Sequence, residues 1–72
     1  MNLQNTILNE LITEKVPVTL YLMNGFQQRG VIVDCDDSVI VMVTDARQHI
    51  FYKHAISTIA PIRLLKSAAR KY

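Results

Sequence analysis

The chain has 72 residues, a net charge of +2 at neutral pH, and hydrophobic side chains at 50% of its positions. A chain this short forms one domain at most and buries only about 60% of its unfolded surface, so a lone subunit would be marginally stable. The high apolar content therefore indicates that copies of the chain associate and bury part of that surface between them.

Cysteine content and hydropathy limit where the protein acts. Its single cysteine, Cys35, excludes a disulfide within the chain and is typical of a reducing compartment. No apolar run is as long as a membrane span, and the sequence opens with no charged-then-apolar leader. We expect a cytoplasmic protein with no membrane partner.

The charge is unevenly distributed along the chain. Residues 1–61 carry four basic and six acidic side chains, whereas residues 62–72 carry four basic side chains and no acidic one. A mildly acidic domain cannot hold nucleic acid through its overall charge. Any RNA site must therefore use pockets for bases, or the short basic C-terminal tail at 62–72.

Residues 3–15 are expected to form an amphipathic helix. Apolar side chains recur there at helical spacing, at Leu3, Ile7, Leu8, Leu11 and Ile12. Pro17 disfavours the helical conformation at the residue before it, so the helix should end near Lys15. Because about three helical turns are marginal alone, we expect this helix to cover one open end of a barrel.

Five short strands should follow the helix, at 16–23, 26–34, 39–44, 48–53 and 57–61. Asn24-Gly25 is the strongest hairpin signal, since a type I′ turn needs positive φ at both central positions. Gly30 should mark a bulge or sharp bend. The prediction is a mainly β fold with an N-terminal helix and a five-stranded, strongly bent antiparallel barrel of SH3-like or OB-like type. Its edge strands invite pairing with another copy.

The sequence gives little support for a metal site or a catalytic site. The acidic run 34–37 suggests a calcium loop, but Val39 stands where such a loop needs glycine. His49 and His54 would point to opposite faces of a continuous strand. No nucleophile elbow, phosphate-binding loop or zinc-protease motif occurs. We therefore expect no metal, no cofactor and no enzyme.

Two features leave their roles open. Tyr21 and Phe26 flank the Asn-Gly turn, where aromatic rings either pack in the core or stay exposed for bases to stack on. Lys53 and His54 place two polar side chains in an apolar stretch, either as a solvated corner or as a site.

The string Tyr52-Lys53-His54-Ala55-Ile56-Ser57-Thr58 resembles the second Sm motif of Hfq, a family of bacterial Sm-like RNA-binding proteins. The similarity covers about residues 3–61. Further matching segments are Leu3-Gln4, Val16-Pro17-Val18, Tyr21-Leu22, Asn24-Gly25-Phe26-Gln27 and Asp36. The resemblance implies an Sm-like barrel and a homohexameric ring, in which the fourth strand of one subunit pairs with the fifth of the next. It also implies an RNA chaperone that acts in stress response and post-transcriptional regulation by binding small regulatory RNAs and mRNAs.

The resemblance further implies two RNA-binding faces. On the helix-bearing, proximal face Lys53 would bond a uracil carbonyl and His54 would contact the backbone or ribose. The residues expected at this uridine site are Gln4, Ser38, Lys53 and His54. The opposite, distal face would bind purine-rich or A-rich RNA through Tyr21, Leu22, Asn24, Gly25, Phe26, Gln27 and Thr58. Phe26 resembles the Gram-positive form of that site, and Lys15 would lie on the rim.

The sequence departs from the family pattern in three places. Asp37 and Ser38 stand where the family usually has Gln or Asn and then an aromatic residue, which removes a stacking ring and weakens the uridine site. The rim is arginine-rich in relatives that anneal RNA strongly, whereas residues 12–15 here are Ile-Thr-Glu-Lys. Annealing of RNA through charge should therefore be weak. Arg29 and His49 occupy positions that help select adenine in enterobacterial relatives.

The basic tail and the function each have two readings. Ile62, Leu65 and Ala69 could form a helical stripe, or the segment could be a frayed terminus; its cations could supply the phosphate contacts that the domain lacks. The leading hypothesis is a ring with an intact purine face and a weakened uridine face. The alternative is an Sm-like structural or interaction ring with little RNA binding, favoured by the acidic domain and the missing aromatic at position 38.

Overall fold

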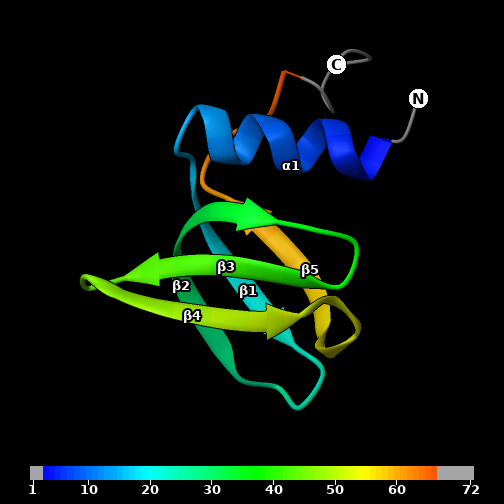
Figure 1. Ribbon diagram of the computed structural model, residues 1–72, viewed down its shortest axis with the longest axis vertical. Helices are drawn as coiled ribbons and strands as arrows, with labels where there is room; N and C mark the ends of the chain where they lie inside the picture. The colour runs from blue at the N-terminus through cyan, green and yellow to red at the C-terminus, as the bar shows by residue number, and fades with distance from the viewer. Residues whose placement is uncertain (1–2, 67–72) are drawn as a thin grey trace.

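The computed structural model describes residues 3–66 as one helix and a five-stranded antiparallel sheet (Figure 1). The elements are α1 (Leu3–Thr13), β1 (Pro17–Leu22), β2 (Gln27–Cys35), β3 (Val39–Thr44), β4 (Arg47–Tyr52), the short 3₁₀ helix η1 (Lys53–Ala55) and β5 (Ile56–Pro61). The strand order is β4-β3-β2-β1-β5, so β4 and β5 are the two edges of a bent, open sheet. The expected fold class is confirmed. Within residues 3–66 no helix has the length and apolarity needed to span a membrane.

The helix lies across one end of the bent sheet (Figure 1). It packs mainly against β2, and it buries Leu8 and Leu11 completely. The buried side chains that form the core come from the helix, from β1 to β3 and from the segment after β5. They are Leu8, Leu11, Val16, Val18, Leu20, Ile32, Ile40, Met42 and Leu65. The expectation that the helix covers one open end of the sheet is confirmed.

The helix ends two residues earlier than the sequence predicts, and its own terminus is the cause. Lys15 has a positive φ of 52°. The amide of Lys15 donates to the carbonyl of Ile12 (3.3 Å), and that of Val16 donates to the carbonyl of Leu11 (3.1 Å). This pair of bonds is the Schellman motif that closes many helices. Pro17 therefore begins β1 rather than stopping α1.

Gly30 allows β2 and β3 to approach closely. A Cβ atom at this position would contact Thr44 Oγ1 and would lie 2.5 Å from the carbonyl oxygen of Val43. The break in register expected at Gly30 lies further along β2, between Ile32 and Asp34. Gly30 thus provides space at the bend, while the bulge itself follows two residues later.

The hairpin predicted at Asn24-Gly25 is present, since β1 and β2 pair across this loop, but its turn differs from the predicted type. The prediction of a type I′ turn at Asn24-Gly25 is wrong, because only Gly25 has positive φ there (93°). The loop is longer, and its Asn24 Oδ1 accepts the amide of Phe26 (3.0 Å). Instead, Asp45 (φ 50°) and Ala46 (φ 64°) form the two-residue turn between β3 and β4, with the φ pattern of type I′.

The first part of the C-terminal tail packs against the helix (Figure 1). Arg63 Nη1 lies 3.2 Å from Glu10 Oε2, which also accepts the amide of Lys66 at 3.0 Å. Leu65 is only 5% exposed and belongs to the core. Residues 62–66 form neither a helical stripe nor a frayed end, while Ala69 and the cations at 70 and 71 lie outside the described residues.

We predict that Leu65→Ala lowers the free energy of unfolding by about 2–4 kcal/mol, because it leaves a cavity in the core. Leu64→Ala is the matched control: Leu64 is 74% exposed, so its truncation should change stability by less than about 0.5 kcal/mol. Urea denaturation followed by circular dichroism measures both. Equal effects would mean that the tail is not docked in solution.

We also predict that Ala46→Gly raises the free energy of unfolding by about 0.5–1 kcal/mol, since glycine removes the steric cost of positive φ at this turn. The control Ala60→Gly, within β5, should lower the free energy of unfolding by a similar amount, because glycine loses more conformational entropy than alanine when the strand folds. Thermal unfolding of the two variants checks the opposite signs. A loss of stability in both would contradict the turn geometry.

Candidate nucleic-acid interface

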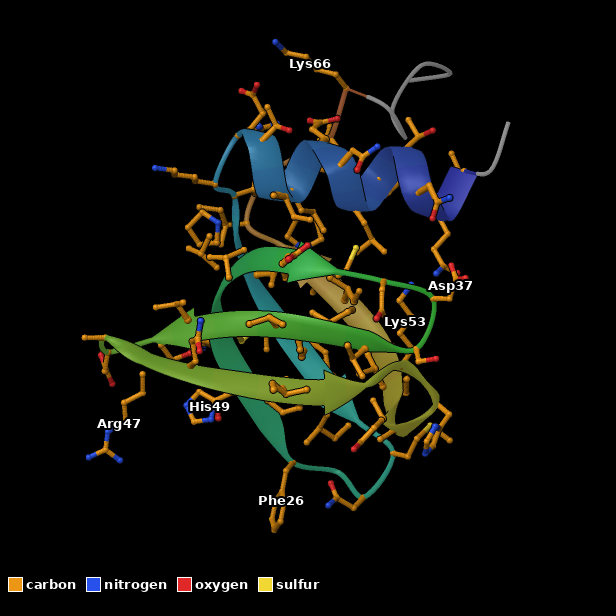
Figure 2. The ribbon with its side chains drawn as sticks, viewed as in Figure 1. Phe26, Asp37, Arg47, His49, Lys53 and Lys66 are labelled. Carbon is orange, nitrogen blue, oxygen red and sulfur yellow. The ribbon has the colours of Figure 1, made fainter. Side chains whose placement is uncertain are left out.

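Phe26 is an exposed aromatic platform on the side of the molecule opposite α1 (Figure 2). Its side chain is 71% exposed. Two backbone contacts fix the loop that presents it: the carbonyl of Phe26 accepts the amide of Leu22 (2.8 Å), and the amide of Gly25 donates to the carbonyl of Leu22 (2.9 Å). Of the two readings that the sequence leaves open, the structure gives the exposed one.

The neighbouring strands bring other expected purine-face residues to the same hairpin. Tyr21 is exposed at the end of β1 and pairs with Gln27 on β2 and with Thr58 on β5. The hydroxyl of Ser57 donates to the carbonyl of Tyr21 (3.0 Å). Of the other residues expected on this face, Asn24 and Gly25 are exposed and Leu22 is half-buried. Met23, which belongs to no motif in the sequence, is also exposed here.

The guanidinium of Arg47 and the imidazole of His49 lie on the same side of the molecule as Phe26. Figure 2 shows the side chains of Arg47 and His49 directed away from α1, with Phe26 on the same side. Arg47 is exposed at the start of β4, and the ring of His49 stacks on Phe51 with centroids 6.2 Å apart. Arg29, on β2, is also exposed. Arg47 was missed as a candidate because it follows a turn that carried no site motif.

A cavity of about 470 Å³ lies on the helix side of the sheet. Its walls come from α1, β3, η1 and β5 and are mostly apolar. The lining residues are Leu3, Gln4, Ile7, Leu8, Ile40, Lys53, Ile56, Ser57, Thr58 and Ile59. Gln4 and Lys53, both expected at the uridine site, are therefore brought together. Thr58 was expected on the purine face, but it also lines this helix-side cavity, since β5 runs from one face to the other.

The other two residues expected at the uridine site lie beside the cavity rather than in its wall. Ser38 is exposed in the loop between β2 and β3, where its carbonyl accepts the amide of Lys53 (2.8 Å). His54 is exposed, and its ring stacks on Tyr52 with centroids 5.8 Å apart. The loop and η1 are thus held together by the backbone bond, so Lys53 stands at their junction.

Asp36 organises the loop between β2 and β3. Its Oδ1 accepts the amides of Ser38 (2.8 Å) and Val39 (2.9 Å). The bond from Ser38, then the bond from Val39 and the charge of Lys53, lower the pKa of Asp36, because each favours the carboxylate. This turn leaves the next residue, Asp37, exposed at the tip of the loop.

The rim of the helix side offers few unpaired cations. Lys15 is exposed in the helix-ending turn, next to the exposed acid Glu14. The charge of Arg63 is paired with that of Glu10. Lys66 is exposed beyond the helix (Figure 2). Among residues 3–66 no group of three or more histidine, cysteine or acidic side chains is arranged to hold a metal ion.

Comparison with known proteins assigns the chain. Residues 3–66 match the family model described as Hfq protein. The chain belongs to the Hfq family. The RNA-binding protein Hfq of Halalkalibacterium halodurans is 46% identical over 63 residues, which span 88% of this chain and 81% of that protein. The RNA-binding protein Hfq of Syntrophomonas wolfei is 44% identical over 63 residues, 88% of this chain and 77% of that one.

Solved Hfq structures share the fold. A crystal structure of the pleiotropic translational regulator Hfq superposes with a TM-score of 0.80 at 39% identity, covering 82% of this chain and 98% of that chain. The Hfq protein from Anabaena sp. superposes with a TM-score of 0.74 at 28% identity, over 81% and 93% of the two chains. Hfq is a family of RNA-binding proteins, not of enzymes. The family match extends to Lys66, beyond residues 3–61 over which the sequence motifs resemble the family, and includes the docked segment.

Proposed function

We propose that this Hfq-family chain is a cytoplasmic RNA chaperone that binds single-stranded RNA on a homohexameric ring and takes part in regulation by small RNAs and mRNAs. The exposed ring of Phe26, opposite the helix and on the same side of the molecule as the cation of Arg47 and the imidazole of His49, is the observation that carries the proposal. Aromatic stacking contributes about 1–3 kcal/mol per base and tolerates any sequence, while nearby cations contact phosphates. The names of the relatives supply the nucleic-acid class.

The ring follows from the open sheet. The edge strands β4 and β5 each have one partner within the chain, so each presents a row of backbone groups to another copy. Exposed apolar side chains accompany the β4 edge, among them Ile50 at 63% and Tyr52. Pairing β4 of one subunit with β5 of the next satisfies both edges at once. Six copies would then repeat the Phe26 platform around one face.

The two faces differ in what they offer a base. The purine face has the exposed rings of Tyr21 and Phe26 together with the amide side chain of Gln27, and an amide can pair with adenine N6 and N7. The helix side has Ser38 in place of a ring, beside the exposed carboxylate of Asp37. Purine-rich RNA should therefore bind more tightly than oligo(U). The exposure of Phe26 favours this function over a ring that binds little RNA.

Phe26→Ala is predicted to weaken oligo(A) binding about 10-fold or more, since each subunit loses its stacking surface. Lys53→Ala, on the helix side, should change oligo(A) affinity by less than about 2-fold. Fluorescence anisotropy at physiological salt, with oligo(U) of equal length as the reference ligand, measures both variants. The opposite ranking, or wild-type protein that prefers oligo(U), would place the main site on the other face.

Light scattering of the purified protein should give about six times the subunit mass of 8.2 kDa. Ile50→Asp puts a charge beside the β4 edge and should shift the mass towards smaller species. The control Leu64→Asp alters an exposed apolar residue outside the sheet and should leave the ring intact. A stable wild-type monomer at micromolar concentration would contradict the ring.

A further inference from the structure

The β2–β3 loop places an anionic acceptor next to the cationic donor of the helix-side cavity. The hydrogen bond from the Lys53 amide to the Ser38 carbonyl fixes this loop against η1. Figure 2 shows Asp37 and Lys53 at the same end of the molecule, near the first turn of α1. Lys53 lines the cavity, and the loop bonded to its amide carries the acid Asp37, so groups of opposite charge come from two connected elements at this end of the molecule.

The two aspartates of the loop have different tasks. Asp36 uses its Oδ1 to accept two backbone amides and so shapes the turn. Asp37 is exposed at the tip, where its carboxylate has two oxygens that act only as acceptors. The neighbouring Asp36 thus holds the backbone, and Asp37 is the acid available to a ligand.

Lys53 complements this acceptor. It is half-buried and lines the cavity, so its ammonium is a donor at an apolar wall. Arg63 and Glu10 form the only ion pair among residues 3–66, so Lys53 and Asp37 do not close into a salt bridge with each other. A cavity of about 470 Å³ lies within the range of small-molecule sites and is large enough for a nucleobase.

The edges of the four bases differ in the hydrogen bonds that they can form with a carboxylate and an ammonium. Guanine alone has two adjacent donors, N1–H and the N2 amino group, next to the acceptor O6. A carboxylate accepts both donors at once, as it does from other paired N–H groups, and lysine donates to O6. Uracil has one N–H between two carbonyls, so a carboxylate oxygen would face a carbonyl. Adenine and cytosine place one amino group beside a ring acceptor and offer a carboxylate a single bond.

We propose that the helix-side cavity selects guanine over uracil, with Asp37 accepting from N1–H and N2–H and Lys53 donating to O6. The apolar walls contributed by Ile56 and Ile59 contact the faces of the base. This inference rests on the proposed RNA-binding function. It names guanine as the base that the weakened uridine site of this protein binds in place of uracil.

The test uses Phe26→Ala protein, in which binding to the purine face is weakened, and compares hexauridine with the same hexamer carrying one internal guanosine. The guanosine hexamer should bind about 10-fold more tightly, which is the discrimination expected of one bidentate pair. A hexamer with inosine, which lacks the N2 amino group, should fall between the two. Adenosine or cytidine at the same position should bind more weakly than guanosine.

Asp37→Asn in this background should reduce the preference for guanosine over uridine to less than about 2-fold and abolish the difference between guanosine and inosine. Asp45→Asn is the matched control, because it removes the same charge from the β3–β4 turn, where positive φ suits asparagine. It should leave both ratios unchanged. Phe26, Asp37 and Asp45 are all exposed, so the three substitutions leave the core intact.

Equal binding of the uridine and guanosine hexamers, or no binding of either, would overturn the inference. So would equal effects of Asp37→Asn and Asp45→Asn, since these would reduce the role of Asp37 to overall charge. Binding of oligo(A) to protein with Phe26 intact is measured alongside. If that binding is present and the guanosine preference is absent, only this inference fails; if both are absent, the proposed function fails too.

Discussion

An antiparallel sheet with two unpaired edges is the constraint on which the rest of this structure depends. The order β4-β3-β2-β1-β5 leaves the first and last strands of the sheet with one neighbour each. Because the sheet is short and strongly bent, it has two ends as well as two edges. One end is covered by α1 and by residues 62–66, whose Leu65 completes the core. The other end stays open and carries Phe26 (Figure 2). Two surfaces of different chemistry follow from this one-sided covering.

The covering of one end of the sheet by α1 and residues 62–66 also determines which basic side chains of this mildly acidic domain remain available to a ligand. On the helix side, Glu10 pairs with Arg63, so docking the tail consumes one of its cations. On the open side, Arg47 is exposed and His49 is half-buried against Phe51. The side that carries Phe26 therefore has an exposed cation, Arg47, although the domain as a whole carries more acids than bases. Local placement, rather than net charge, makes that face suitable for a phosphate backbone.

The sequence predicts the order of elements well because periodicity and breakers are local signals, but it predicts contacts between distant segments poorly. Asn24-Gly25 is the stronger turn signal, yet the Asn24 side chain accepts a backbone amide and opens a longer loop. The pairing of Thr44 with Arg47 forces Asp45-Ala46 into the tight turn instead. The docking of the tail depends on Glu10, more than fifty residues away, and no tail motif announces it. At the candidate site, motif matching found Lys53, but only the register of β5 places Thr58 at the cavity.

The adjacent aspartates at 36 and 37 show why residue types alone cannot assign a site. Both are exposed acids in one loop. The sequence motif distinguishes Asp36, which matches the family pattern, from Asp37, which departs from it, but it does not say what either carboxylate contacts. The backbone separates them: two amides converge on Asp36 and lower its pKa, with the bond from Ser38 contributing most. A carboxylate used in this way is a structural element of the turn, and its replacement would disturb Asp37 and Lys53 together. Asp37 is one residue further on, where it is exposed at the tip of the loop whose Ser38 carbonyl accepts the amide of Lys53. The loop therefore uses one carboxylate to hold its backbone and leaves the other exposed as an acceptor, so it is not a uniform acidic patch.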